Sequence, residues 1–467
     1  MQSNGNLGAE DTNHLELVEK FKGGSVKANQ KPIIVIVGLL LIGLLTPSFT
    51  TAAKTLDEQI ITDAYVYLLG RALVIRQEQM DIQEPGIDYN VIKYNPLGSA
   101  DFVNPNLDVA YLEAWIAVDD NTPVLLEIPP IKGRYYTAQI CDEWGEVITN
   151  INQRNYPLHP YGKFAFVAPG SRSEVPNDSV RIELHSYKAK MLARVELQTD
   201  KSGAVELQRQ FKLTTISKAN IEPAVELPSF NNKDLIGVEV FDRADVILKS
   251  AMDVSPIAAQ MQAKVRAVAG MAADPKQRGK LDDLLREKVI PGFLKYAVTQ
   301  AGKYQNNWLG TVVIGNYGDD YRIRSAANLV GIWANASSEV IYFVATRDSD
   351  GQPLSGANRY RLHFPSDGLP EAVVDAYWSV ILVDIPDYRV VPNRMDRFNF
   401  NSYSKLKPNA DGSLTILISA QPYGSVPESN WLPAPEDKPF SLTFRTYVPK
   451  DVVKTGQWFP PAVTRAQ

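Results

Sequence analysis

Apolar residues recur with two different periods along the chain, and the changes of period divide it into segments. Over residues 56–80 they return at intervals of three and four residues, beginning with Leu56, Ile60 and Ala64. This spacing places them on one face of an α-helix, so we expect a helix there. Asp57 supports a helix start, because acidic side chains stabilise the positive end of the helix dipole.

From about residue 83 to residue 230 the apolar residues occur in short runs that proline, glycine, asparagine or aspartate interrupt. Runs of this kind are typical of β-strands, and two of them alternate as half-buried strands do. The strands expected here span residues 114–118, 124–128, 135–140, 164–167, 179–185 and 193–197. We expect them to form a β-sandwich of modest size.

Helical spacing returns over residues 234–302, including the stretch 257–273, and again over 321–334. The chain then becomes strand-like once more, with a turn signal in the stretch 409–412. The later strands are expected at residues 340–345, 360–364, 378–383, 414–418 and 442–447. A second β-sandwich, of jelly-roll type, accounts for them best.

These patterns predict a mainly β (α+β) protein. A length of 467 residues agrees with more than one domain, because it exceeds what one compact core usually supports. The expected parts are a leader at 1–53, an N-terminal helix at 54–82, a β-sandwich at 83–232, a helical segment at 233–335 and a second β-sandwich at 336–467.

The leader contains thirteen consecutive residues without a polar side chain, at 33–45. Lysines precede this run, and small and hydroxyl-bearing residues follow it up to Ala53. Such an arrangement is typical of a secretory signal peptide, so we expect an exported protein of the periplasm or cell envelope. The alternative is an uncleaved anchor, since residues 32–53 carry no charge. Contact with the membrane is expected only through this leader, if it is not cleaved.

Composition excludes several classes of function. The formal net charge of −5 disfavours a nucleic-acid partner, which needs concentrated lysine and arginine. Cys141 is the single cysteine, so the chain offers neither an internal disulfide nor a thiolate metal site. No two histidines of the mature region lie at metal-ligand spacing, and the glycine-rich phosphate-binding motifs are absent from the sequence. We therefore expect no metal and no cofactor.

Polar and aromatic residues gather in two stretches of the first β-region. The ligand-binding candidates there are Asn106, Tyr111, Arg134, Tyr135 and Gln139, and the catalytic candidates are Asp108, Tyr136 and Asp142. In a strand, the two-residue period places Arg134 and Tyr136 on one face and Tyr135 on the other.

Two interpretations of these residues stand side by side. In the structural one, Asp108 closes a turn, Arg134 neutralises an acid and the tyrosines pack with their hydroxyls satisfied. In the functional one, Arg134 holds an anionic group of a ligand, and Asp108 or Asp142 acts as acid or base. The structural interpretation has somewhat more support, because buried ion pairs perturb the same groups as an active site does.

Two tryptophans of the second β-region are further candidates. Trp431 stands close to two prolines, and with Trp378 it could form an aromatic platform for a sugar ring or another flat apolar face. The alternative role for both is to stabilise the fold, and we favour it. Ser379 has no histidine near it in sequence, so nothing indicates a nucleophile there.

The motifs resemble two families that occur together. The stretches 104–111 and 133–136, with Gln139, Asp142 and Trp144, resemble domain-of-unknown-function family 1254. Later stretches resemble family 1214, and these lie at residues 359–365, 375–379, 409–413, 430–435 and 456–461.

The resemblance runs from about residue 56 to the end of the chain and includes the bridging stretch 315–321. It implies an exported bacterial protein with an immunoglobulin-like N-terminal sandwich, a helical middle and a jelly-roll-like C-terminal sandwich. It implies no reaction and no catalytic residue. Val109 departs from the family pattern, which commonly has threonine at that position.

Three functions remain open after these exclusions. The first is an envelope protein that binds a small molecule or acts as a scaffold, and we favour it. The second is an enzyme without metal or nucleotide, using Asp, Arg and Tyr chemistry on a small polar or carbohydrate-like substrate. The third is an assembly factor in which the second sandwich forms a homo-oligomer.

Overall fold

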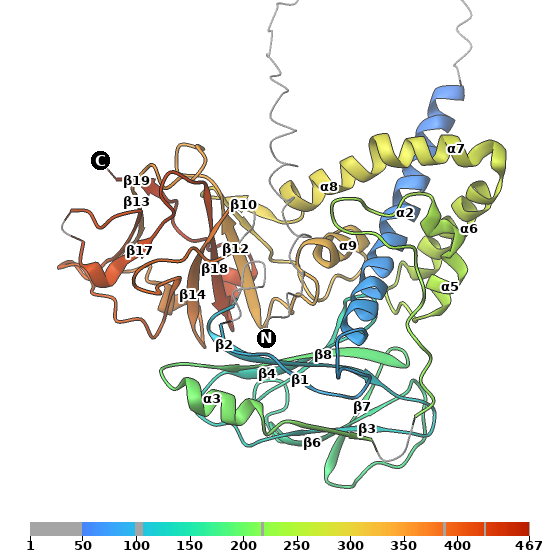
Figure 1. The fold of residues 1–467 in the computed structure, drawn as a ribbon, viewed down its shortest axis with the longest axis horizontal. Helices are drawn as coiled ribbons and strands as arrows, with labels where there is room; N and C mark the ends of the chain where they lie inside the picture. The colour runs from blue at the N-terminus through green and yellow to red at the C-terminus, as the bar shows by residue number, and fades with distance from the viewer. Residues whose placement is uncertain (1–48, 99–105, 216–218, 386–388, 425, 467) are drawn as a thin grey trace, which may run out of the picture.

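The computed structural model describes residues 49–98, 106–215, 219–385, 389–424 and 426–466. The apolar run predicted to be a signal peptide or anchor lies outside these residues. Two β-sandwiches and a group of helices make up the described chain (Figure 1). The expected fold class, mainly β with a helical middle, is confirmed. Within the described ranges, no helix is long and apolar enough to cross a membrane.

The first sandwich contains two sheets. Sheet A has the strand order β1-β2-β8-β4-β5, and sheet B has the order β7-β6-β3-β9. The strands are β1 (Lys93–Tyr94), β2 (Val109–Ala117), β3 (Val124–Ile128), β4 (Tyr136–Cys141), β5 (Val147–Ile151), β6 (Gly162–Val167), β7 (Ser179–Glu183), β8 (Lys188–Glu196) and β9 (Lys212–Thr215). Helix α3 (Lys201–Gln208) follows β8. Alternate residues of the strands, such as Leu112 and Phe164, fill the core between the sheets.

The helices form a core of their own around α2 (Phe49–Ile82). The others are α4 (Glu239–Asp242), α5 (Ala244–Lys249), α6 (Ala258–Ala273), α7 (Pro275–Leu284), the π-helical turn η1 (Leu285–Val289), α8 (Ile290–Thr299) and α9 (Tyr321–Val330). Most residues of α2 between Ile61 and Ile75 are buried, because helices cover it on several sides. Helix α2 begins at Phe49, inside the segment that we assigned to the leader.

The second sandwich also contains two sheets. Sheet C has the order β10-β11-β12-β18-β14-β15, and sheet D has the order β17-β16-β13-β19. Its strands are β10 (Lys303–Gln305), β11 (Trp308–Gly310), β12 (Val340–Ala345), β13 (Tyr360–Phe364), β14 (Trp378–Asp384), β15 (Asn399–Asn401), β16 (Leu414–Ser419), β17 (Trp431–Pro433), β18 (Phe440–Tyr447) and β19 (Thr464–Arg465). Three short helices complete it, η2 (Pro370–Val373), η3 (Glu428–Asn430) and α10 (Asp451–Lys454).

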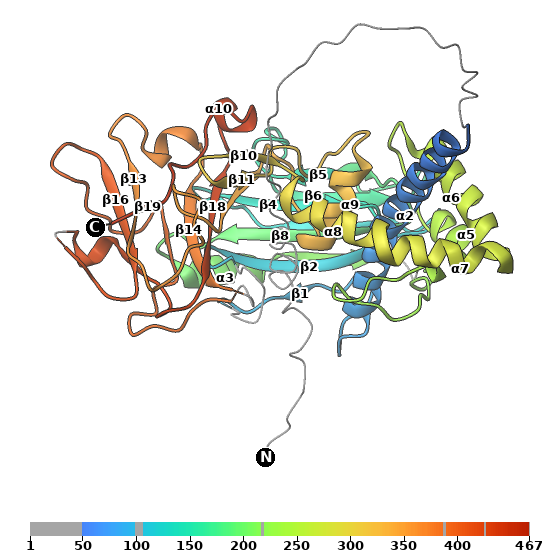
Figure 2. The ribbon, with the colours of Figure 1, turned by 90° about the horizontal axis from the view of Figure 1, so that it is seen from above.

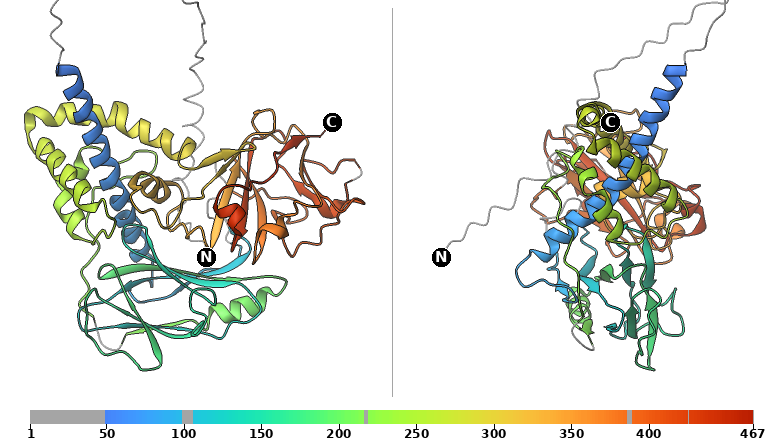
Figure 3. Two further views of the ribbon diagram at one scale, coloured as in Figure 1. Left: turned by 180° about the vertical axis from the view of Figure 1, so that it is seen from behind. Right: turned by 90° about the vertical axis from the view of Figure 1, so that its right-hand side faces the viewer.

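Sheet A is the element that joins the three parts. One face of it packs on sheet B, and its strands extend from beneath the second sandwich to beneath the helices (Figure 2). Helix α2 runs down onto the same sandwich when the molecule is seen from behind (Figure 3). The outer face of sheet A, opposite its own core, is therefore covered by helices at one end and by sheet C at the other.

Candidate functional site

The outer face of sheet A carries charged residues that solvent does not reach. On β8 these are Lys188, Lys190, Arg194 and Glu196, and each is at most 8% exposed. Their alternate neighbours Ala189, Met191, Ala193 and Val195 fill the sandwich core. The strand thus has the expected alternation, but its polar side faces protein instead of water. Buried charges need partners, and the surroundings of these four differ along the strand.

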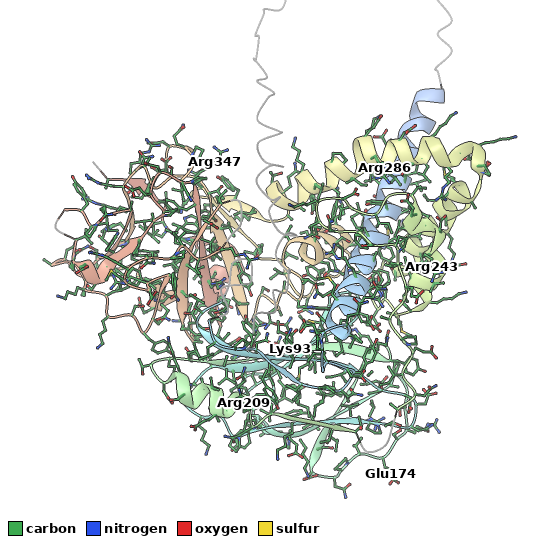
Figure 4. The ribbon with its side chains drawn as sticks, in the orientation of Figure 1. Lys93, Glu174, Arg209, Arg243, Arg286 and Arg347 are labelled. Carbon is green, nitrogen blue, oxygen red and sulfur yellow. The ribbon has the colours of Figure 1, made fainter. Side chains whose placement is uncertain are left out.

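Under the helices, the cations have close carboxylate partners. Lys190 lies 2.7 Å from a carboxylate oxygen of Asp81 on α2 and 2.7 Å from one of Glu113 on β2. Lys188 lies 2.7 Å from Glu78, also on α2. Lys93, labelled in Figure 4 where sheet A meets α2, pairs with Glu84 at the sheet edge. This half of the face is a neutralised contact between helix and sheet.

Under sheet C, Arg194 has no carboxylate partner among the residues that the structure describes. One of its guanidinium nitrogens donates to Gln139 Oε1 at 2.7 Å, and the guanidinium stands 5.3 Å from the centre of the Tyr111 ring. The remaining two nitrogens are buried without a hydrogen bond, and no described carboxylate forms an ion pair with Arg194, which is 1% exposed. An arginine stays charged in a protein. Arg194 is therefore a buried positive charge that the described chain does not neutralise.

Gln139 is held so that its oxygen faces Arg194. Its amide nitrogen donates to the carbonyl oxygens of Trp333 and Ala334 at 3.0 and 3.1 Å. It also lies 3.0 Å from the sulfur of Cys141. Because these acceptors orient the amide nitrogen toward themselves, the opposite end of the amide, Oε1, faces the guanidinium of Arg194 and accepts its hydrogen bond.

Tyr111 contacts Arg194, and tyrosines of the second sandwich lie near enough to interact with it electrostatically. Tyr111 comes from β2, Tyr342 from β12 and Tyr447 from the end of β18, and the first two are half-buried. Asn106 joins the two sandwiches, since its amide nitrogen donates to the hydroxyls of Tyr111 and Tyr447 at 3.2 and 2.5 Å. We call Arg194 and these four residues the Arg194 cluster.

A second guanidinium lies beside this cluster. Arg445 on β18 is paired in register with Tyr342 on β12 and is 3% exposed. Burial raises the pKa of Tyr342, while the nearby charges of Arg194 and Arg445 oppose that rise. The local field is therefore positive, and the half-buried tyrosine hydroxyls can donate hydrogen bonds within it.

Asp108 lies close by, on the loop before β2. One carboxylate oxygen, Oδ1, accepts hydrogen bonds from the amides of Asn399 and Asn401 at 2.7 and 2.9 Å. The other oxygen, Oδ2, is buried without a hydrogen bond from any described residue. The backbone nitrogen of Asp108 donates to Asn106 Oδ1 at 2.9 Å, so a local turn links the acid to the Arg194 cluster.

The structure therefore gathers five of the predicted residues in one region, Asn106, Asp108, Tyr111, Tyr135 and Gln139. Tyr135 precedes β4 and inserts its ring among the tyrosines of sheet C, 5.5 Å from Tyr447 between ring centres. Its hydroxyl donates to Glu339 at 3.0 Å.

Arg134 and Tyr136 lie away from this region. Arg134 donates to the backbone oxygen of Glu196 at 2.7 Å and pairs with the exposed Asp200 at 3.1 Å. Tyr136 belongs to the core of the first sandwich, where its hydroxyl donates to the carbonyl oxygen of Pro160. These contacts satisfy both side chains and fit the structural interpretation.

Asp142 belongs to a separate cluster at the turn between β4 and β5. Its Oδ2 lies 2.7 Å from Nδ1 of His185, which is 28% exposed, and its Oδ1 accepts from the backbone nitrogens of Trp144 and Glu146. The hydrogen bond to Asp142 raises the pKa of His185 above its ordinary value. Burial raises the pKa of Glu146 to about 7.

Both tryptophans are buried in the second sandwich. Trp378 stacks on Phe444 with 5.5 Å between ring centres, and its indole nitrogen donates to Glu371. The indole nitrogen of Trp431 donates to the backbone oxygen of Ser419 at 2.9 Å. Neither ring presents a face to solvent.

Sequence reasoning missed Arg194, Tyr342, Arg445 and Tyr447. The available signal was the row of alternate polar residues along 188–196, but an alternating strand indicates only that one face differs from the other. Which face is covered depends on segments far away in the sequence. Among the described residues, no group of three or more histidine, cysteine, aspartate or glutamate side chains could hold a metal ion.

Family comparisons agree with the motifs. Residues 89–215 match DUF1254 and residues 339–451 match DUF1214, each described as a protein of unknown function. The chain therefore belongs to the paired DUF1254 and DUF1214 families, with the two domains in the order that its motifs predicted. That prediction is confirmed.

A solved structure resembles the chain in fold. The VPA0106 protein from Vibrio parahaemolyticus is 22% identical, with a TM-score of 0.66 over 88% of this chain and 100% of that chain. An uncharacterized protein from Burkholderia cenocepacia is 12% identical, with a TM-score of 0.43 over 91% of each chain. No curated protein matches the sequence.

Proposed function

We propose that this protein binds a small anionic ligand between its two sandwiches, with Arg194 as the anchor. One observation carries the proposal: Arg194 is buried and charged, yet no described carboxylate pairs with it. Leaving a buried charge unpaired costs several kcal/mol, on the order of 3–5 kcal/mol when a partner is lost. A ligand that supplies the missing negative charge would recover much of that free energy as binding affinity.

The chemistry of the cluster favours a carboxylate or a phosphate. A guanidinium offers parallel N–H groups that match the oxygens of either anion. The tyrosine hydroxyls around it can donate further hydrogen bonds. Tyr111 and Tyr342 are half-buried, so part of the cluster remains in contact with solvent. The amide of Gln139 orients the guanidinium before any ligand arrives.

Isothermal titration calorimetry on the full chain tests this proposal. The probes are inorganic phosphate, citrate, gluconate and hexanoate. We expect at least one of them to bind, and Arg194→Gln to weaken that binding by about 10- to 100-fold, as expected for hydrogen bonds to a charged group. The matched control is Arg134→Gln, which removes an arginine from the same sandwich but outside the cluster and should leave the affinity unchanged. Equal loss in both variants would contradict the proposal.

Unfolding measurements provide a second test of the role of Arg194. If the residue serves a ligand, Arg194→Gln should leave the stability of the ligand-free protein unchanged or raise it, because it removes an uncompensated charge. The expected readout is an equal or higher midpoint of thermal unfolding. A marked fall in the midpoint would show that the guanidinium stabilises the fold, and the proposal would then be wrong.

We also propose that the protein is exported. Support comes from the apolar run at residues 33–45 and from the lysines that precede it, as in a signal peptide. Mass spectrometry of the mature N-terminus in a bacterial host tests this. A chain that begins near Lys54 and is found outside the cytoplasm is the expected result, and a cytoplasmic chain that retains residues 1–31 would contradict it.

A further inference from the structure

Three buried oxygens that accept or donate no hydrogen bond to a described residue lie between the loop before β2 and the outer face of sheet C. They are Oδ2 of Asp108, the hydroxyl of Tyr377 and Oγ of Ser379, and the three residues are at most 3% exposed. Buried oxygens of this kind are rare, since most buried polar groups find a partner. Three of them at one contact between domains need an explanation.

The contacts place these oxygens near each other. Ser379 and Tyr377 stand two residues apart, so their side chains leave the same face of sheet C. Ser379 is paired in register with Asn401, and the amide of Asn401 donates to Asp108 at 2.9 Å. Burial raises the pKa of the Tyr377 hydroxyl, and the nearby negative charge of Asp108 raises it further.

The same group continues into the Arg194 cluster. The ring of Tyr377 stacks on that of Tyr447, with 4.1 Å between centres and an angle of 11°. The hydroxyl of Tyr447 accepts the hydrogen bond from Asn106, and Asn106 accepts one from the backbone of Asp108. Ser379 is also paired in register with Arg445. Cationic and hydroxyl-rich groups thus form one continuous polar region between the sandwiches.

We infer that the anion bound at Arg194 is a hydroxylated one, such as a sugar acid or another hydroxy acid, and that Asp108, Tyr377 and Ser379 bind its hydroxyl groups. This inference rests on the proposed anion site. A ligand hydroxyl donates one hydrogen bond and accepts others, so it can donate to Asp108 and accept from Tyr377 or Ser379. An ammonium group only donates, and it would leave the protons of both protein hydroxyls without an acceptor.

Selectivity follows from the same geometry. A site built to hydrogen-bond a ligand hydroxyl discriminates strongly against an analogue that lacks it, because the protein groups are then left unpaired. A plain carboxylate should therefore still reach Arg194 but should bind more weakly than a hydroxylated carboxylate of equal chain length.

Calorimetry with gluconate and hexanoate on the full chain tests the inference, because the two carboxylates have equal chain length and differ in their hydroxyl groups. We expect gluconate to bind at least about tenfold more tightly. Ser379→Ala should reduce this ratio several-fold without changing the affinity for hexanoate, and Asp108→Asn should reduce it further. Ser413→Ala, at a buried serine whose hydroxyl already pairs with Asp411, is the matched control and should leave the ratio unchanged.

The outcomes separate the inference from the proposal on which it rests. If both carboxylates bind equally and Arg194→Gln abolishes both, anion binding stands and the hydroxyl inference is overturned. If an amino acid of equal chain length binds more tightly than gluconate, the inference is also overturned. If no anion binds, the proposed function itself fails. Ser379→Ala keeps the test usable should Asp108→Asn fail to fold, since it removes only an oxygen without a hydrogen bond.

Discussion

At the scale of single residues, the immediate neighbours of a charge decide its role. Lys190 and Arg194 lie on the same strand, on the same face, and both are buried. Lys190 contacts two carboxylates, whereas Arg194 contacts an amide and aromatic rings. The first therefore stabilises the contact between helix and sheet. The second, Arg194, is buried without a carboxylate partner among the described residues.

His185 allows a prediction about pH at this same scale. Its pKa is raised above 6.5 in the folded protein, chiefly by the hydrogen bond to Asp142, with Glu146 and Asp253 also contributing. A histidine whose pKa is higher in the folded state stabilises the fold at pH values below its pKa in the unfolded chain. This stabilisation is lost as the pH rises through its pKa in the folded protein. We expect the His185 pair to contribute on the order of 1 kcal/mol to the free energy of unfolding at mildly acid pH, since the pair is partly exposed, and to contribute nothing at mildly alkaline pH.

Urea unfolding across that pH range measures the contribution. The free energy of unfolding of His185→Gln should lie below that of the parent at mildly acid pH, and the gap should close as pH rises. His159→Gln is the control, because no carboxylate pairs with His159 within the described residues. A gap that widens with pH would contradict the assignment of the Asp142 pair as the cause.

At the scale of elements, helix α2 and sheet A are joined through buried charge. Tyr89 and Lys188 both contact Glu78, and the indole nitrogen of Trp115 donates to Asp81 at 2.9 Å. A helix that lies on the polar face of a sheet needs complementary carboxylates along its contact side. Apolar periodicity alone does not reveal such a contact, because the contacting residues are polar.

Lys190→Met tests how much this contact contributes to stability. The substitution removes the buried ammonium group that the half-buried carboxylates of Asp81 and Glu113 share, and it leaves Glu113 with only Lys93 at 3.9 Å. We expect a loss of about 3 kcal/mol in the free energy of unfolding, the lower end of the range for a broken buried pair. Chemical denaturation provides the measurement. Lys163→Met is the matched control on the same sandwich, where the pair with Asp178 is exposed, and it should change stability little. Similar losses in the two variants would show that burial of the pair is unimportant.

At the scale of the whole molecule, Tyr135 connects the two sandwiches. It comes from the first sandwich, and its ring packs edge-on against Tyr377 and Tyr447 of the second. Its hydroxyl donates to Glu339, which also pairs with Arg154 at 2.5 Å. Aromatic and charged groups thus make this interface from both sides, so we expect the two sandwiches to unfold together.

Tyr135→Ala should allow the two sandwiches to unfold separately. Removal of a buried aromatic ring costs about 3–5 kcal/mol, while Tyr135→Phe, which deletes only the hydroxyl, should cost about 1 kcal/mol. Native-state hydrogen exchange reports on β8 and β18 separately. In the parent protein, the amides of β8 and β18 should exchange with the same free energy of opening. In the alanine variant, the two strands should have different free energies of opening. Two free energies already present in the parent would contradict the expected coupling.

Much of the fold could be predicted from local patterns. The run at 124–128 became β3 and the run at 340–345 became β12, both with the predicted bounds, because short apolar runs between turn residues specify strands locally. Strands β10 and β11 were not predicted, since each has three residues and lies inside the expected helical segment at 233–335, between its two stretches of helical spacing. Helix α2 extends seven residues further toward the N-terminus than Leu56, the residue at which its apolar period begins.

The candidate site was predictable only in part. Asn106, Asp108 and Tyr111 form a compact sequence motif, and the structure brings them to one place. In the functional interpretation of the sequence, the cation that holds an anionic ligand is Arg134, which stands beside Tyr135 and Tyr136. In the structure, Arg134 turns to Asp200, while Arg194, remote from the motif in sequence, lies against Tyr111. Sequence distance does not report which strand becomes a neighbour in a sheet.

The sequence by itself determined most of the longer elements, the mainly β fold class with a helical middle and the two families, because each depends on residues that are close together along the chain. The tertiary structure alone decided that the polar face of β8 is covered and that its arginine meets tyrosines instead of carboxylates. The physical reason is that the charge state and solvation of a side chain depend on everything packed around it. For Arg194, those neighbours come from β2, β4, β12 and β18, which lie far apart in the sequence.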